Sequence, residues 1–210
     1  MQAVVMHETG DPDVLRNEEI DRPEPGDGEL LIKVRAASVN PADWKLRRGF
    51  MNKPLPTVLG YDVSGTVETS LADGFAEGDE VFGSSASGGY AEYSTASAGM
   101  IAKKPEGVSH EQAAAIPVAG LTAWQALFDR GGLVSGQSAF VAGAAGGVGH
   151  FAVQFAKVAG ARVIGTSSTR NRDFVLGLGA DEYVDYTQQD VGEADRRRFL
   201  LTGSAPRALR

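Results

Sequence analysis

Hydrophobic and polar residues alternate over short stretches in the first half of the chain. The alternation is clear in residues 29–39, 62–68 and 90–96, and clusters of glycine, proline, aspartate and serine separate these stretches. A period of two directs every second side chain to the same face of a strand. We therefore predict that the chain up to about residue 105 is mostly antiparallel β-sheet.

A short helix interrupts these predicted strands. Asn40 is a good N-cap residue, Pro41 suits the first helical position, and Asp43 is favourable in the first turn. Gly49 is suited to end the helix. We predict a helix over residues 41–48.

Helical spacing replaces the alternation near residue 106. Ser109 and Gln112 form a capping-box pattern, and after Pro117 an amphipathic stretch runs to the two glycines at 131–132. These features predict helices that connect the β-rich half to the rest of the chain.

The next residues follow a repeated strand-helix order. Hydrophobic runs predict strands over 138–143, 161–168 and 181–186, and helical spacing that ends at glycine predicts helices over 148–159 and 170–179. The order β-α-β-α-β is that of the adenosine-binding half of a doubly wound parallel sheet. The predicted fold class is therefore mixed α/β.

We divide the chain into a β domain over 1–110, a partial nucleotide-binding domain over 111–190 and an atypical tail over 191–210. The tail differs in charge. Residues 195–210 contain five arginines and one aspartate, whereas the whole chain has a net charge of −7.

The composition argues against several classes of protein. The chain has 210 residues, of which 42% are hydrophobic, so it can bury a core, but it contains no run of about 18 apolar residues that would span a membrane. Its N-terminus carries no secretory signal, and we expect a cytoplasmic protein. The net negative charge argues against a nucleic-acid partner. Because cysteine is absent and His7, His110 and His150 are scattered, no metal site is predicted.

The strongest motif lies between the predicted strand 138–143 and the helix after it. Read with alanine in the first glycine place, it matches the dinucleotide-binding fingerprint, in which small residues allow a tight turn and bring helix N-terminal amides close to a pyrophosphate. The residues predicted to bind the cofactor there are Ala144, Ala145, Gly146, Gly147, Val148 and Gly149. The alternative is a tight turn with a purely structural role.

The end of the second predicted strand indicates which dinucleotide binds. An NAD site usually carries an acidic residue there, whereas the 2′-phosphate of NADPH needs hydrogen-bond donors and positive charge. This chain offers Ser167, Ser168, Arg170 and Arg172, with no acid before Asp173. NADPH is therefore favoured over NADH. The alternative is that Ser168 or Thr169 only caps the second helix while the arginines face solvent.

Seven segments, taken in order, resemble the medium-chain dehydrogenase/reductase superfamily, and specifically its zinc-free quinone oxidoreductase (zeta-crystallin-like) branch. The likeness runs from residue 1 to about 190, and its segments are RAASVNPAD, VLGYDVSGTV, GGYAEY, AGLTAWQAL, GAAGGVG, VIGTSS and LGADEYVDY. The resemblance implies a GroES-like antiparallel β-barrel domain followed by a Rossmann domain. It also implies NADPH-dependent hydride transfer to a quinone or an α,β-unsaturated carbonyl, and a homodimer is possible in the family.

The resemblance also implies roles for single residues. Asn40 is expected to face the substrate or cofactor, and Thr122 the nicotinamide end. Ser168, Arg172 and Tyr186 are expected around the 2′-phosphate. Zinc-dependent relatives would have a Gly-His-Glu segment where this chain has Gly60-Tyr61-Asp62. Trp44 and Lys45 stand where quinone reductases of this branch often have a substrate-side tyrosine, so the acceptor can differ.

Each of these residues has a simpler interpretation. Asn40 can be an N-cap alone, or an N-cap that also polarises the oxygen of the hydride acceptor. Thr122 can hydrogen-bond its own helix, and Tyr186 can merely end a strand. Tyr61 is expected to pack in a core. Asp62 is expected to pair with an arginine, and no Ser-His-Asp set is apparent in the sequence.

The predicted Rossmann domain has only the three strands that precede the reversal of strand order. We therefore expect strand 138–143 to be an exposed, apolar sheet edge. The resemblance is expected to end near residue 192 because of a frameshift or premature end in the coding sequence, or because the chain is a genuine short variant. A non-catalytic remnant or structural protein that binds adenine nucleotide weakly is the alternative function.

Overall fold

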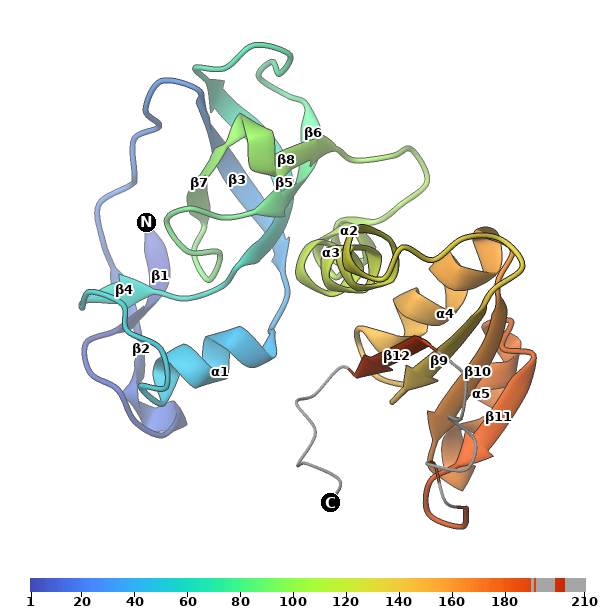
Figure 1. Ribbon diagram of the computed structural model, residues 1–210. Helices are drawn as coiled ribbons and strands as arrows, with labels where there is room; N and C mark the ends of the chain where they lie inside the picture. The colour runs from blue at the N-terminus through green and yellow to red at the C-terminus, as the bar shows by residue number, and fades with distance from the viewer. Residues whose placement is uncertain (190, 192–198, 203–210) are drawn as a thin grey trace. The chain divides into compact units, whose positions relative to one another are not determined.

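The structure is a computed structural model that describes residues 1–189, 191 and 199–202. The chain divides into two compact units, the first over Met1–Val118 and the second beginning at Ala119, and each is described by itself. The first unit holds antiparallel sheets and the second a parallel sheet (Figure 1). The predicted mixed α/β class is confirmed.

A five-stranded antiparallel sheet forms the body of the first unit. Its strands, in spatial order, are β7 (Tyr93–Ser97), β3 (Glu29–Ala37), β5 (Asp62–Ser70), β6 (Glu80–Ser84) and β8 (Ile101–Lys103). Leu30 and Ile32, at alternate positions of β3, have no exposed surface and lie on one face of the strand. Leu31 between them is also buried, so both faces of β3 are covered there. They pack with Val63, Val67 and Val81 into one apolar cluster.

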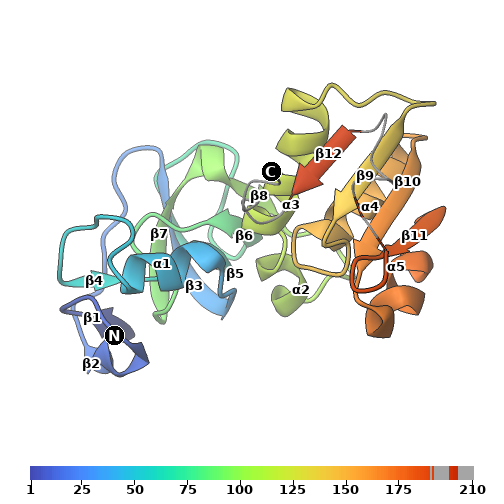
Figure 2. The ribbon, with the colours of Figure 1, turned by 60° about the horizontal axis from the view of Figure 1, so that its bottom comes forward.

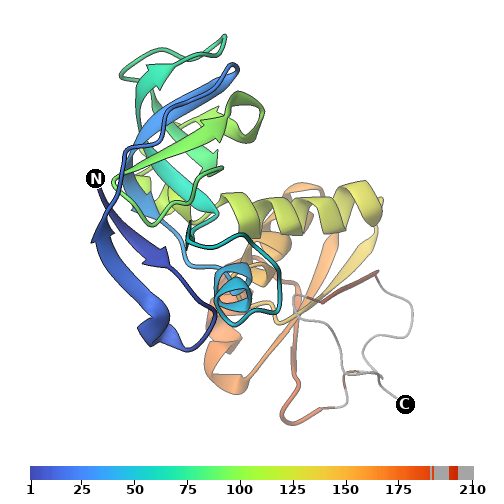
Figure 3. The same cartoon turned by 90° about the vertical axis from the view of Figure 1, so that its left-hand side faces the viewer.

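A smaller antiparallel sheet contains the N-terminus. Strand β1 (Gln2–Met6) lies between β2 (Leu15–Glu19) and β4 (Thr57–Val58), and the β1–β2 hairpin is drawn in dark blue in Figure 3. Short 3₁₀ turns, η1 (Pro12–Val14) and η2 (Ala98–Met100), precede β2 and β8.

Two helices of the first unit follow the capping signals in the sequence. Helix α1 spans Pro41–Arg47, and helix α2 spans His110–Ala114. The Ser109 hydroxyl accepts a hydrogen bond from the Gln112 amide at 3.2 Å, and the Gln112 side chain accepts from the Ser109 amide at 3.0 Å. Because α2 packs on β3, β5 and β6, it belongs with the first unit, which extends past residue 110.

The second unit alternates strands and helices. Helix α3 (Pro117–Trp124) leads into this unit and continues as a π-helical segment, η3 (Gln125–Arg130). The strands are β9 (Ser138–Ala142), β10 (Arg162–Ser167), β11 (Glu182–Asp185) and β12 (Phe199–Thr202). Helix α4 (Gly149–Val158) follows β9, and the 3₁₀ turn η4 (Thr169–Asn171) and helix α5 (Arg172–Gly177) follow β10. Phe140 and Ile164, from neighbouring strands, have no exposed surface. The β-α-β-α-β order is as predicted.

The expectation of an open sheet edge at β9 is wrong. Strand β12 pairs with β9 in parallel, with Phe199 opposite Ala139, and the sheet order is β11-β10-β9-β12 (Figure 2). An unpaired buried strand would leave its amides and carbonyls without partners, and β12 supplies them. This order matches positions 3-2-1-4 of a doubly wound sheet, so the reversal of strand order is present. The remainder of the predicted tail, residues 192–198 and 203–210, lies outside the described residues.

Candidate functional site

The turn between β9 and α4 is tight enough to require glycine at two places. Gly143 has a φ of 67°, in the left-handed region. A Cβ atom on Gly149 would lie 2.1 Å from the carbonyl oxygen of Gly143, far inside van der Waals contact. The last glycine of the motif therefore lets the start of α4 pack against the end of β9.

The same turn has backbone amides without a hydrogen-bond acceptor in the described part of the chain. Within the described residues, no backbone hydrogen bond is donated by Gly147, Val148 or Gly149, whereas Gly146 donates to the carbonyl of Gly143 at 2.8 Å. These free donors lie at the positive end of α4, a ten-residue helix. Ala144 is fully buried and Ala145 partly so, which leaves Gly146 and Gly147 exposed. The turn has the shape and donors that a dinucleotide pyrophosphate needs.

The carboxyl ends of β10 and β11 lie side by side next to this turn. Their register pairs Ser167 with Asp185, so Ser168 and Tyr186 leave the sheet at adjacent strand ends. Ser167 is buried and donates to the carbonyl of Ser168 at 3.2 Å. Tyr186 is 55% exposed. The residues predicted for a 2′-phosphate are thus on one edge of the sheet.

Both arginines of this edge are accessible. Arg170 is exposed, and Arg172 forms one exposed ion pair with its neighbour Asp173 at 3.1 Å. The alternative role of Ser168 and Thr169 as side-chain caps has no support in the hydrogen bonds: neither hydroxyl caps the following turn. Within the described residues the Ser168 hydroxyl has no partner, and the Thr169 hydroxyl donates to Asp185.

In the first unit, Asn40 occupies the N-cap position of α1 but turns its side-chain amide elsewhere. The amide donates to the Ser38 hydroxyl and to Oδ2 of Asp62, both at 2.9 Å. Asn40 is 8% exposed. Its side chain therefore belongs to a buried polar cluster centred on Asp62.

Among the described residues no arginine pairs with Asp62, and neutral donors surround its carboxylate instead of the expected arginine. Its carboxylate accepts hydrogen bonds from Ser38 at 2.9 Å, from Asn40 at 2.9 Å and from the backbone amide of Val118 at 3.2 Å. The side chain has no exposed surface, and this burial raises its pKa above the usual value of an aspartate. Neutral hydrogen-bond donors therefore surround this carboxylate. They come from the segment that joins β3 to α1 and from the first turn of α3.

A second buried carboxylate lies beside this cluster. Asp43 accepts from the backbone amides of Asn40 at 2.7 Å and Gly60 at 3.0 Å, and it is 2% exposed. Burial, followed by the nearby charge of Asp43, raises the pKa of the Tyr90 phenol. The sequence signals Asp43 only as a first-turn helix residue. Tyr61 packs beside Tyr90 against Met6 and Leu46, as expected.

Thr122, expected near the nicotinamide end, and Trp44, at the place of a substrate-side tyrosine in relatives, are both exposed. Thr122 lies on α3 in the second unit. Trp44 is 42% exposed on α1 and makes an edge-to-face contact with Phe50, which is 70% exposed. Large exposed apolar side chains of this kind are common at ligand and partner sites.

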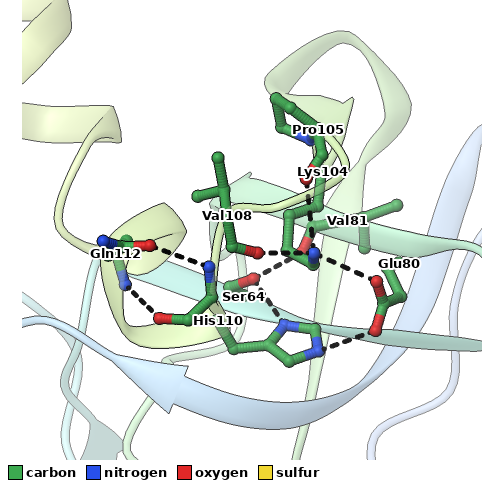
Figure 4. A network of polar contacts seen from close by, with 9 residues as sticks. Ser64, Glu80, Val81, Lys104, Pro105, Val108, His110 and Gln112 are labelled. Carbon is green, nitrogen blue, oxygen red and sulfur yellow. Dashed lines mark hydrogen bonds and ion pairs between the residues drawn. The ribbon is translucent and has the colours of Figure 1, made fainter.

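A Ser-His-Glu arrangement that the sequence does not reveal joins α2 to the sheet (Figure 4). His110 Nδ1 lies 2.8 Å from the Ser64 hydroxyl, and His110 Nε2 lies 3.2 Å from Glu80. Ser64 has no exposed surface and donates its proton to the carbonyl of Val81 at 2.9 Å. A buried hydroxyl whose proton is already used cannot attack a substrate. The network therefore anchors α2.

Within the part of the chain that is described, no three acidic, histidine or cysteine side chains gather in a way that could hold a metal ion. No helix formed by the described residues is long and apolar enough to cross a bilayer.

Two family models match the chain. Residues 26–106 match the alcohol dehydrogenase GroES-like domain, and residues 147–200 match the zinc-binding dehydrogenase family. The second match reaches the first two residues of β12, so the likeness continues beyond the predicted limit near residue 192. The sequence likeness is thus consistent with the pairing of β12 in the sheet.

Named proteins and solved structures are similar over most of this chain. A chloroplastic quinone-oxidoreductase homolog of Spinacia oleracea is 42% identical, with 84% of this chain and 58% of that protein covered. An NADPH-dependent alkenal/one oxidoreductase of Arabidopsis thaliana is 40% identical, covering 91% of this chain and 54% of that protein. A mycobacterial structure in complex with NADPH has a TM-score of 0.82 and 41% identity, covering 90% of this chain and 59% of that one.

The chain spans between 53% and 63% of the length of the curated relatives it matches. Over that span the antiparallel unit, the glycine turn and the parallel sheet all have counterparts in the matched families. The chain belongs to the medium-chain dehydrogenase/reductase superfamily, in its quinone oxidoreductase branch.

Proposed function

We propose that this chain binds NADPH and is built to reduce a quinone or an α,β-unsaturated carbonyl by hydride transfer. The nicotinamide supplies the hydride when the cofactor is bound. The protein must hold the cofactor, orient the acceptor and polarise its oxygen. The relatives named as quinone and alkenal/one oxidoreductases support this reaction class.

The observation that carries the cofactor choice is the edge formed by β10 and β11. It offers the Ser168 hydroxyl, the exposed Arg170 and Arg172 and the exposed Tyr186 to a 2′-phosphate. The free amides of Gly147, Val148 and Gly149 would hold the pyrophosphate. Guanidinium groups bind phosphate strongly because they donate charge-assisted hydrogen bonds in a planar fork.

On the acceptor side we propose Asn40 as the polarising donor. Its amide makes two hydrogen bonds in the protein, one to the Asp62 carboxylate and one to the Ser38 hydroxyl. The bond to Asp62 is charge-assisted and would keep the side chain oriented. The bond to the neutral Ser38 hydroxyl is the weaker one and would be exchanged for a bond to the acceptor oxygen. A hydrogen-bond donor suits this role in a chain that lacks cysteine and has Tyr61 and Asp62 in place of His and Glu.

The phosphate-binding turn supports a second candidate. Its unpaired amides can bind a nucleotide pyrophosphate whether or not an acceptor binds elsewhere. The second candidate function is therefore nucleotide binding without turnover of a substrate.

One assay separates these two functions. The purified chain is mixed with NADPH and either a quinone or an enone, and NADPH oxidation is followed by absorbance. Turnover that requires both partners supports the reductase. Stabilisation by NADPH in a thermal melt without any turnover supports the nucleotide-binding protein. Absence of both turnover and stabilisation rejects both functions.

A further inference from the structure

Asp185 ends β11 directly beside the loop that carries Ser168, Arg170 and Arg172. We propose that Asp185 is a positioning residue that fixes this loop through Thr169 and so sets the preference of the site for a 2′-phosphate. This inference rests on the proposed binding of NADPH. The proposal is based on a hydrogen-bond network that occupies all the acceptor positions of the Asp185 carboxylate, so that none remains for a ligand.

All hydrogen-bonding positions of the Asp185 carboxylate are used. Oδ1 accepts from the Thr187 amide at 2.9 Å and from the Thr187 hydroxyl at 2.6 Å. Oδ2 accepts from the Thr169 hydroxyl and from the Gln188 side-chain amide, the latter at 3.3 Å. A carboxylate has about four lone-pair sites, and four donors occupy them.

This saturation bears on cofactor choice. An acidic residue selects NAD by accepting hydrogen bonds from the ribose hydroxyls. Asp185 is 7% exposed and already accepts hydrogen bonds from four donors. It therefore cannot accept from the ribose hydroxyls without losing some of these bonds. These hydrogen bonds lower the pKa of Asp185 and so stabilise its charged form.

The Thr169 hydroxyl connects this network to the loop. It donates to Asp185 and accepts from the Gln188 amide at 3.0 Å, so both its proton and a lone pair are fixed. Thr169 lies between Ser168 and Arg170 and begins the turn η4, which the Asn171 amide closes on the Ser168 carbonyl at 2.9 Å. Holding Thr169 therefore holds the backbone from which the proposed phosphate-binding side chains extend.

Substitutions of Thr169 test the proposal with the least disturbance of the fold. Thr169→Val removes the hydroxyl and keeps the branched shape, and Thr169→Ser keeps the hydroxyl as the matched control. Because Thr169 is exposed, neither change opens a core cavity. Asp185→Asn is the partner change, since an amide has one acceptor oxygen where the carboxylate has two.

The probes are adenosine 2′,5′-bisphosphate, which carries the 2′-phosphate, and 5′-AMP, which lacks it, with affinities measured by calorimetry. We expect T169V and D185N to weaken bisphosphate binding about tenfold and to leave 5′-AMP binding within about twofold, the size expected when a hydrogen bond to a charged group is lost. T169S should match the original chain.

The role of Asp185 and the NADPH site itself are tested by different results. If T169V binds the bisphosphate as tightly as the original chain, or weakens both probes equally, Asp185 does not position the 2′-phosphate site. If the original chain itself binds the bisphosphate no better than 5′-AMP, the proposed NADPH site is rejected, and the positioning role with it.

Discussion

The side-chain amide of Asn40 donates a 2.9 Å hydrogen bond to the Asp62 carboxylate, which has no exposed surface. Asn40 is the N-cap of α1 and Asp62 begins β5, so this bond ties α1 to the five-stranded sheet. A buried carboxylate held only by neutral donors is costly to ionise. The bond between these residues is therefore sensitive to pH.

Replacing Asp62 by asparagine should change how stability depends on pH. Burial raises the pKa of Asp62, so between its usual value and the raised value the folded chain binds more protons than the unfolded chain. In that window the contribution of Asp62 to the free energy of unfolding falls as pH rises. The asparagine cannot titrate and lacks this decline.

We expect the stability of the original chain minus that of D62N to be largest near the usual pKa of aspartate and to shrink toward neutral pH. Urea denaturation over a pH series, followed by tryptophan fluorescence, measures it. A difference that stays constant or grows with pH would contradict the role of burial.

Arg172→Ala should weaken NADPH binding much more than NADH binding. A guanidinium contributes charge-assisted hydrogen bonds to a phosphate, and losing one costs about 2 kcal/mol, or a factor of roughly 30 in affinity. NADH lacks the 2′-phosphate and should bind almost unchanged.

Arg162→Ala is the matched control for this change. Arg162 is an exposed arginine at the opposite end of β10, where it pairs with Glu182. R162A should leave the NADPH to NADH ratio unchanged, as measured by fluorescence titration. If R172A loses affinity for NADPH and NADH equally, Arg172 does not bind the 2′-phosphate.

Gly149→Ala and Gly147→Ala should separate the two uses of glycine in the turn. A Cβ on Gly149 would overlap the Gly143 carbonyl, and such overpacking costs about 1–3 kcal/mol of unfolding free energy. A Cβ on Gly147 meets no atom within 4 Å, so G147A should stay within about 0.5 kcal/mol of the original stability. We expect G147A to lose nucleotide affinity instead, because its methyl group enters the space next to the free amides. Thermal melts with and without NADPH measure both effects, and a G149A variant as stable as the original chain would refute the packing.

His110→Ala should destabilise the first unit by about 1–2 kcal/mol, since it removes one of the two hydrogen-bond partners of the fully buried Ser64 hydroxyl. Glu80→Gln should cost less than about 1 kcal/mol because the Glu80 side chain is 54% exposed and exposed ion pairs contribute little. Urea denaturation of the two variants shows which one loses more free energy of unfolding. If E80Q destabilises the chain as much as H110A, the anchor of α2 is its ion pair with Glu80 and not the hydroxyl contact, because H110A removes both.

Local sequence signals predict most elements of this fold. Alternation in residues 29–39 and 62–68 corresponds to β3 and β5, and the caps at Asn40 and Ser109 begin α1 and α2. The glycine turn between β9 and α4 is also predicted from local sequence, because only glycine fits beside the Gly143 carbonyl at position 149. Such features depend on neighbours in the chain.

The features that local signals do not predict depend on distant contacts. Asp62 meets donors from Ser38, Asn40 and Val118, and no spacing in the sequence indicates that these groups converge. The same holds for Ser64 and His110, which lie on β5 and α2. The hydrogen bond from Thr169 to Asp185 likewise depends on the parallel register of β10 and β11.

The pairing of β12 with β9 gives the second unit a late step in folding. Strand β9 ends at Ala142, and its partner begins only at Phe199, after α4, β10, α5 and β11 have been made. During synthesis the apolar edge of β9 stays open until that distant segment emerges, and such long-range parallel pairing is slow. Aggregation of the nascent chain would therefore be governed by how fast this one strand arrives, and a chaperone that shields β9 would raise the yield of folded protein.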